Sequence, residues 1–296
     1  MITLAHLSDA HLAPLPPVRA TDLLNKRITG FLNWKAKRHK SLDGEGLTRL
    51  VHHLHSQHPD VVAITGDIMN LSLDAEINTA LNWLQTVGGP ENVCLTPGNH
   101  DAYVPGQLER ALERWVRYVL GETVDENQFP YVRRMGEVAV VVCNSAVPTL
   151  PFMASGHFDA RQQARLTRCL SLLGDAGYFR VVMIHHPPNQ EHAHPRLGLH
   201  GAKRFRAAVA AAGAELILHG HTHKSTIFAI PGPEADVPVV GVAAAGTAQH
   251  DTKHDPARYN LFRIERVGRA WQCTMREFGF QRLNSDIVQR LSVRIY

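Results

Sequence analysis

The chain has 296 residues, of which 44% are hydrophobic and 20% charged, and this balance excludes a disordered, collagen-like or coiled-coil protein. It has no uncharged apolar run of the roughly 18 residues that a membrane span needs, and no signal-peptide pattern. Its four cysteines show no Cys-x-x-Cys spacing. We therefore expect a cytoplasmic protein with reduced thiols. The net charge is +4. Between Arg19 and Lys40, seven basic residues and one acid give +6, so the rest of the chain has a net charge of −2. Because the positive charge is confined to one segment, a nucleic-acid partner is not expected.

Short β-branched runs alternate along the chain with helical patterns. In chain order, strands are predicted at residues 2–8, 61–65, 92–96, 138–144, 180–184, 215–219, 237–242, 259–264 and 270–276. Helices are predicted at residues 46–57, 73–87, 107–120, 160–174 and 202–212. The first half is βαβαβ and the second is richer in strands, which favours an α/β sandwich in a single domain over residues 1–296.

Five of the predicted strands end in short polar motifs. These are Asp9-Ala10-His11, Gly66-Asp67, Gly98-Asn99-His100-Asp101, His185-His186-Pro187-Pro188 and Gly220-His221-Thr222-His223. Carboxylate, imidazole and amide groups on loops at strand ends suit a rigid metal site, because the sheet fixes the bases of the loops. Histidine is a common metal ligand, and most of the 19 histidines lie in clusters, so the sequence predicts a metal site.

All five motifs in this order resemble the calcineurin-like metallophosphoesterase superfamily, over residues 3 to about 224. The resemblance implies a four-layer α-β-β-α sandwich with two metal ions. It implies that one ion is held by Asp9, His11 and His223, the other by Asn99, His185 and His221, and that Asp67 bridges both. A carboxylate has two oxygens with which to span ions about 3.5–4 Å apart. Nitrogen and oxygen ligands without thiolate suit Mn, Fe, Zn or Co and do not choose among them.

Two assignments within the motifs stay open. His185 and His186 compete for one ligand position, and we favour His185 because the apolar strand leads straight into it, as in the family. His100 would face the scissile phosphate and stabilise the transition state or protonate the leaving oxygen. The group that orients His100 is either Asn70, through its amide oxygen at a position where many relatives have an acid, or Asp101, whose usual role is to brace the loop.

The resemblance implies hydrolysis of a phosphate ester by metal-activated hydroxide. Protein phosphatases of the superfamily usually have an arginine just before Gly-Asn-His; Pro97 occupies that position here, which favours a phosphodiester substrate. The motifs look most like those of bacterial cyclic-nucleotide and glycerophosphodiester phosphodiesterases. The alternative is a hydrolase of lipid-linked pyrophosphates or phosphoesters at a membrane surface, similar to the UDP-diacylglucosamine hydrolases, which often have arginine in the position of His100.

A basic amphipathic insertion is predicted at about residues 18–40, and we call residues 19–40 the basic segment. Ala20, Leu24, Ile28 and Phe31 follow helical spacing, while Lys26 lies on another side. The segment is either a wall of the active site or an element that contacts an anionic membrane. We favour the wall; the alternative places the protein at the inner membrane surface.

Overall fold

The computed structural model of the protein describes residues 1–38, 42–188, 196–247, 255–281 and 285–296. The strands are β1 (Ile2–Leu7), β2 (Val61–Ile64), β3 (Val93–Leu95), β4 (Tyr131–Met135), β5 (Val138–Val142), β6 (Gly156–His157), β7 (Phe179–Met183), β8 (Leu199–His200), β9 (Leu216–His219), β10 (Thr226–Ile230), β11 (Val237–Gly241), β12 (Arg258–Val267), β13 (Ala270–Phe280) and β14 (Ile287–Arg294). The helices are α1 (Arg27–Asn33), α3 (Gly44–Ser56), α4 (Asp74–Val87), α5 (Gln107–Arg114), α6 (Ala160–Asp175) and α7 (Ala202–Ala212).

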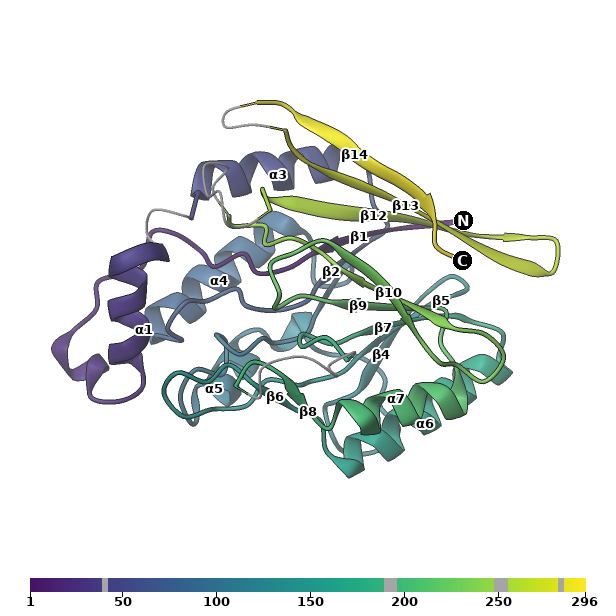
Figure 1. The fold of residues 1–296 in the computed structure, drawn as a ribbon, viewed down its shortest axis with the longest axis horizontal. Coiled ribbons are helices and arrows are strands. Elements are labelled where there is room, and N and C mark those ends of the chain that lie inside the picture. The colour runs from purple at the N-terminus through teal and green to yellow at the C-terminus, as the bar shows by residue number, and fades with distance from the viewer. Residues whose placement is uncertain (39–41, 189–195, 248–254, 282–284) are drawn as a thin grey trace.

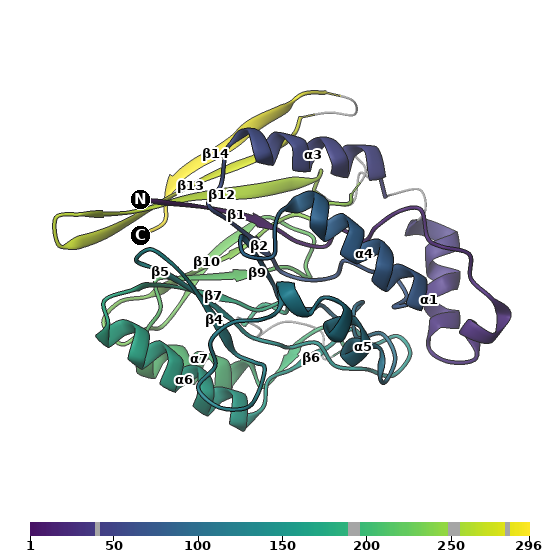
Figure 2. The same cartoon turned by 180° about the vertical axis from the view of Figure 1, so that it is seen from behind.

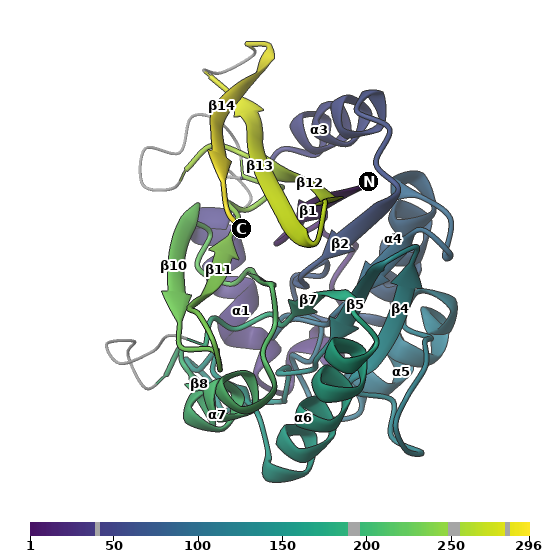
Figure 3. The ribbon, with the colours of Figure 1, turned by 90° about the vertical axis from the view of Figure 1, so that its right-hand side faces the viewer.

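Two six-stranded sheets face each other, with helices on their outer sides (Figure 1). The first sheet has the order β14-β13-β12-β1-β2-β3 and the second β10-β11-β9-β7-β5-β4. Helices α3 and α4 lie over the first sheet, and α6 and α7 pack together over the second (Figures 2 and 3). This is the α-β-β-α sandwich that the resemblance implies, and the predicted fold is confirmed.

The central strands of each sheet are buried on both of their faces. One apolar cluster joins the two sheets, with Leu4 and Ile64 from the first and Val181 and Leu216 from the second. A second cluster lies between the second sheet and α6 and α7. Strands covered on both sides become continuous apolar runs, as in β2, where all four residues are buried, and this explains why such strands can be recognised in the sequence. All four cysteines are buried with free thiols.

All nine predicted strands are present, and β12 and β13 extend beyond their predicted ends. Strands β4, β6, β8, β10 and β14 were not predicted. The predicted helix over residues 107–120 ends at Arg114, and only a short 3-10 turn, Val116–Tyr118, follows it. Among the described residues, no helix is both long and apolar enough to cross a membrane.

The basic segment is broken into short pieces rather than one helix. A 3-10 turn, Ala20–Leu23, precedes α1, and a π-helical turn, Trp34–Arg38, follows it. The buried Arg27 side chain fastens α1 to the loop after β2, since its Nε donates to the Leu71 carbonyl (2.9 Å) and its Nη2 to the Ser72 carbonyl (2.5 Å). In Figure 1, α1 stands at the outer end of the molecule, beyond the end of α4.

Candidate metal centre

All seven predicted metal ligands lie on loops that directly follow β1, β2, β3, β7 and β9. Five of them have positive φ angles: Asp9 (54°), His11 (40°), Asp67 (54°), His221 (68°) and His223 (56°). Such a conformation is uncommon for residues other than glycine and costs about 1–3 kcal/mol each, so it persists only where surrounding structure enforces it. Backbone strain is therefore concentrated at the place where the motifs meet.

Two glycines allow the loops after β2 and β3 to touch. Gly66 has a φ of 91°, and a Cβ atom there would lie 2.5 Å from the backbone nitrogen of Gly98 and 2.9 Å from Nδ1 of His185. A Cβ atom on Gly98 would overlap the carboxylate of Asp67. A side chain at either position would push the predicted ligands apart.

The first cluster contains Asp9, His11 and His223. Nε2 of His223 lies 3.2 Å from Oδ1 of Asp9 and 3.3 Å from Nε2 of His11. His11 donates its Nδ1–H to the carbonyl of Met69 (3.1 Å), so the lone pair of the neutral ring is on Nε2, which faces the cluster. Oδ1 of Asp9 is buried and faces the His223 ring. Electron pairs of a carboxylate and of imidazole thus point toward one place.

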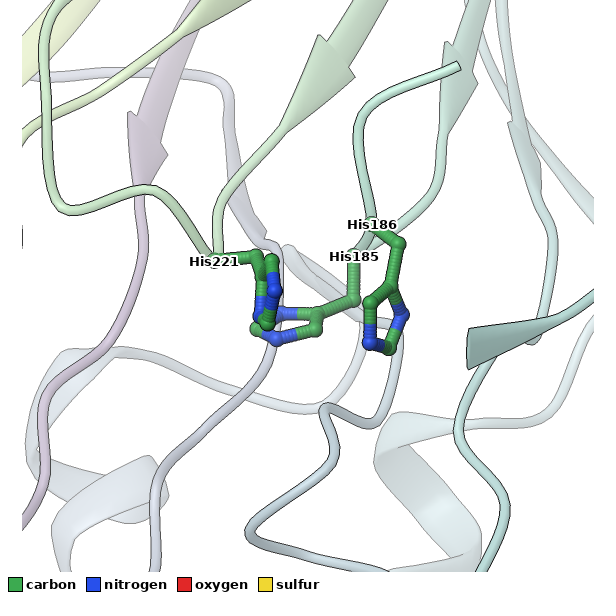
Figure 4. Close-up of side chains that lie close together, drawn as sticks. All are labelled: His185, His186 and His221. Carbon is green, nitrogen blue, oxygen red and sulfur yellow. The ribbon is translucent and has the colours of Figure 1, made fainter. Parts of the chain in front are cut away.

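The second cluster contains Asn99, His185 and His221; Figure 4 shows the two imidazoles side by side. His185 donates Nδ1–H to the Thr65 carbonyl (2.5 Å), and His221 donates Nε2–H to the Leu197 carbonyl (2.8 Å). Their other nitrogens lie 3.2 Å and 2.9 Å from Oδ1 of Asn99. In the neutral rings these nitrogens carry lone pairs, so three electron pairs again converge.

Asp67 lies between the two clusters. Its Oδ2 is 3.5 Å from Nε2 of His185 in the second cluster and 3.9 Å from Nε2 of His11 in the first. Its Oδ1 accepts the backbone N–H of His100 (2.7 Å). We expected one oxygen of Asp67 for each ion. In the structure a single oxygen, Oδ2, faces both clusters, because Oδ1 accepts the N–H of His100.

Two fully buried carboxylates remain charged here. Burial alone would raise the pKa values of Asp9 and Asp67, but His223 beside Asp9 and His185 beside Asp67 hold both pKa values below their usual range. Burial would lower the pKa of His185, yet Asp67 and Asp9 raise it to about 9. Burial lowers the pKa of His221 to about 4. Cations placed between the two clusters would compensate the buried negative charges and accept the converging lone pairs, so these residues fit two metal ions.

His186 is also near the second cluster, and distance alone would group it with His185 and His221 (Figure 4). Its hydrogen bonds point the other way. Its Nδ1 is paired with Oγ of Ser145 (2.8 Å) and its Nε2 with the carbonyl of Ala154 (3.2 Å). Both nitrogens therefore have partners outside the cluster, which supports the choice of His185 as the ligand.

His100 is oriented by a backbone group. Its Nδ1–H donates to the main-chain carbonyl of Asn70 (2.6 Å), whereas the Asn70 side chain donates its amide to the Leu12 carbonyl (2.9 Å). Of the two residues left open by the sequence, Asn70 is the one that contacts the His100 ring, through its main-chain carbonyl and not through the amide oxygen. The His100 ring packs edge-on against His11 (4.8 Å) and stacks on Tyr103 (5.3 Å).

Asp101 braces the loops, as expected from the sequence. Its carboxylate accepts the backbone N–H groups of Asp67 (2.9 Å), Met69 (3.0 Å) and Gly98 (2.8 Å), together with that of Ile68. These bonds tie the loop after β2 to the loop after β3. Asp101 is thus a positioning residue for Asp67 rather than a group that meets the substrate.

A cavity of about 320 Å³ opens beside Asn99 and His100, and α1 forms one of its walls. Nζ of Lys26 lies 4.5 Å from the centre of the Tyr103 ring, and donates to Oγ1 of Thr149 (2.5 Å) and the carbonyl of Met153 (2.9 Å). Burial lowers the pKa of Lys26 to about 8. The sequence marked Lys26 only as part of a charge run, and no motif signalled Tyr103.

The family model of the calcineurin-like phosphoesterases matches residues 2–225, so the chain belongs to this family. The fold is similar to that of a dimetal phosphatase from Danio rerio, with TM-score 0.67, 12% identity and coverage of 100% of this chain and 99% of that chain. It is also similar to a purple acid phosphatase from yellow lupin seeds, with TM-score 0.58, 12% identity and coverage of 99% and 53%. A search of curated proteins finds no match.

These similarities to solved structures establish the fold, and the family adds the chemistry. Together with the buried His/Asp clusters, family membership defines a metal-dependent phosphoesterase whose residues fit a dimetal site.

Proposed function

We propose that the protein is a dinuclear phosphodiesterase, with Asp9, His11 and His223 holding one ion, Asn99, His185 and His221 the other, and Asp67 both. The observation that carries the diester assignment is the charge of the cavity beside His100. Among the described residues that line it, Lys26 is the single ammonium and there is no guanidinium. A dianionic monoester is typically held by the paired N–H groups of arginine, whereas one ammonium matches the single charge of a diester.

The reaction needs three contributions from this chain. Two bound cations, of Mn, Fe, Zn or Co, would supply an activated water nucleophile and neutralise phosphate oxygens. His100 keeps its Nδ1–H on the Asn70 carbonyl, so Nε2 is the nitrogen that exchanges a proton with the leaving oxygen. Lys26 and His100 both contact the Tyr103 ring and line the same cavity, where the Lys26 ammonium attracts the anionic ester.

A hydrolysis panel tests the substrate class. Each metal is added to the metal-free protein, and kcat/KM is measured for bis-p-nitrophenyl phosphate and p-nitrophenyl phosphate. We expect the diester to be cleaved faster with every metal that gives activity. A preference for the monoester across several metals would reverse the assignment.

Metal stoichiometry tests the dinuclear centre separately from the substrate. Elemental analysis should find two ions per wild-type chain, loss of both in Asp67→Ala and loss of chiefly one in His223→Ala, because Asp67 lies between the two clusters and His223 belongs to the first. A fully active wild-type protein with one ion would contradict the model.

The second candidate, a hydrolase of lipid-linked pyrophosphates or phosphoesters, shares this chemistry. It is favoured by exposed apolar side chains on the basic segment. Adding a lipid pyrophosphate to the hydrolysis panel distinguishes the two candidates. The cytoplasmic location stays a prediction.

A further inference from the structure

Large apolar side chains are exposed on two short segments near the cavity. In the basic segment, Leu24 is 84% exposed and Leu32 60%, with Ile28 between them also exposed. Ile28 and Leu32 are four apart in α1 and lie on one side of it, and Leu24 lies in the turn just before the helix. In the loop over residues 147–154, Leu150 and Phe152 are exposed as well. We call these five side chains the outer face.

The two segments are fastened to each other. Nζ of Lys26 donates to Thr149 and Met153, which flank Leu150 and Phe152 in the sequence. Phe152 also lines the cavity beside His100. The outer face therefore reaches the cavity beside His100 through Phe152.

The basic segment thus has two different sides. Lys26, Thr29, Gly30 and Asn33 line the cavity, while Leu24, Ile28 and Leu32 are exposed to solvent. The inward side supports the wall that we favoured from the sequence. A wall alone does not explain the outward leucines, because a solvated surface helix usually carries polar residues there.

The charge around the outer face points to one kind of partner. In the same segment Lys35 is exposed, and Arg19 is exposed while it pairs with Asp22 (3.2 Å); the basic segment carries +6 in the sequence. A second copy that docked through the same face would bring the same positive charge against it and be repelled. An anionic bilayer can bind both the apolar and the basic side chains. The leucine and phenylalanine side chains would lie among the headgroups, and the cations would lie at the phosphates.

We propose that the outer face docks the protein on an anionic lipid surface, with the cavity opening next to that surface. The docking does not depend on the proposed diesterase activity, since it uses no metal ligand. The proposal combines the two roles that the sequence left open for the basic segment: α1 is a wall of the cavity on one side and a membrane contact on the other.

Vesicle co-sedimentation of the full chain tests the apolar part. Wild-type protein should sediment with vesicles of phosphatidylglycerol and phosphatidylcholine, not with phosphatidylcholine alone, and 0.5 M NaCl should release it. Leu24→Ser/Leu32→Ser should abolish sedimentation. The matched control is Leu120→Ser/Leu172→Ser, which changes two leucines that are 54% and 55% exposed elsewhere and should sediment like wild type. Both variants should keep wild-type hydrolysis of a soluble ester, which shows that they fold.

A second pair of variants tests the charge. Arg19→Gln/Lys35→Gln should weaken vesicle binding about 25-fold, because each cation near an anionic surface contributes about fivefold. Lys203→Gln/Arg204→Gln on α7 removes the same charge from exposed positions elsewhere and should bind like wild type. The proposal is overturned if wild type does not sediment, if the controls lose binding equally, or if sedimentation equilibrium shows a dimer that Leu24→Ser/Leu32→Ser abolishes.

Discussion

Backbone carbonyls decide which histidine nitrogen faces the metal centre. Met69, Thr65 and Leu197 each accept an N–H from a predicted ligand, and the carbonyl of Asn70 does the same for His100. A neutral acceptor fixes the ring without adding negative charge. The centre already contains two buried carboxylates, so further acids behind the imidazoles would increase the repulsion that metal ions must offset.

The first prediction concerns His100. Because it meets the clusters through ring packing against His11, His100→Ala should keep both metal ions and lower kcat by roughly 10²–10⁴, the scale of a lost acid–base group. Elemental analysis and kcat measure the two effects. Distance alone would also allow His100 as a ligand with His11 and Asp67; loss of metal in His100→Ala would show that it is one.

Asn70→Ala is the matched control for that experiment. The substitution removes the amide but keeps the main-chain carbonyl that accepts from His100, so kcat should change much less than in His100→Ala. A loss of kcat as large as that of His100→Ala, with metal retained, would show that the side chain has the orienting role.

A pH-dependent KM is expected from Lys26. Burial lowers its pKa to about 8, so its charge is present below pH 8 and is lost above it, and KM for an anionic diester should rise through that range. Lys26→Met should have a higher KM with no such rise, whereas Lys35→Met, on the exposed side of the segment, should behave like wild type. A flat wild-type profile of KM between pH 7 and 9.5 would contradict a substrate contact.

The same lowered pKa of Lys26 affects stability. Between the folded pKa of about 8 and the unfolded value of 10.5, the unfolded chain binds more protons. The free energy of unfolding therefore rises with pH over this range, while substrate affinity falls.

At the scale of elements, the interior strands of the two six-stranded sheets could be predicted, but among their four outermost strands only β3 could. Three of the missed strands, β4, β10 and β14, are outermost in their sheets. Strands β4 (Tyr-Val-Arg-Arg-Met) and β14 (Ile-Val-Gln-Arg-Leu-Ser-Val-Arg) carry charged and polar residues that interrupt an apolar run. Strand β10 (Thr-Ile-Phe-Ala-Ile) is largely apolar, and it was overlooked in the sequence. The two-residue strands β6 and β8 are too short to leave a pattern.

In the candidate site, residues in local motifs could be predicted, whereas contacts between distant parts of the chain could not. The seven metal residues could be placed because each motif is local and follows a buried strand. The contacts of Lys26 with Tyr103 and of Tyr103 with His100 join distant parts of the chain, and no spacing predicts them. Helical periodicity placed Leu24, Ile28 and Phe31 on one apolar side, but only Phe31 packs inward, because the turns around α1 break the period.

Helix propensity and packing predict opposite effects of Gly30→Ala on the free energy of unfolding. In an isolated helix, Gly→Ala stabilises by about 1 kcal/mol. Here a Cβ atom would overlap the Tyr103 hydroxyl and lie 2.8 Å from Leu71, so Gly30→Ala should lower the free energy of unfolding by about 1–3 kcal/mol. Denaturant unfolding measures it, and Tyr103→Phe in the same chain should recover part of the loss. A more stable Gly30→Ala variant would show that α1 is not held against Tyr103.

At the scale of the whole molecule, each cluster draws on both sheets. Asp9 and His11 follow a strand of the first sheet and His223 one of the second; Asn99 follows the first, and His185 and His221 the second. Bound ions would therefore cross-link the two sheets at the end where their loops meet, in addition to the apolar cluster between them. The single domain over residues 1–296 stays a prediction, and one cooperative unfolding transition would support it.

Metal binding should therefore stabilise the entire fold rather than the loops alone. Without cations, Asp9 and Asp67 stay charged and buried at the junction of the sheets, and an ion at 100 times its Kd adds about 2.7 kcal/mol. Calorimetry should show Tm higher by several degrees in saturating Mn²⁺ than in chelator, with hydrogen exchange slowed at the loop ends of both β1 and β9. Asp236→Asn, at an exposed acid, should keep the full shift, and His223→Ala should keep about half. Equal Tm values with metal and with chelator would mean that the ions do not join the sheets.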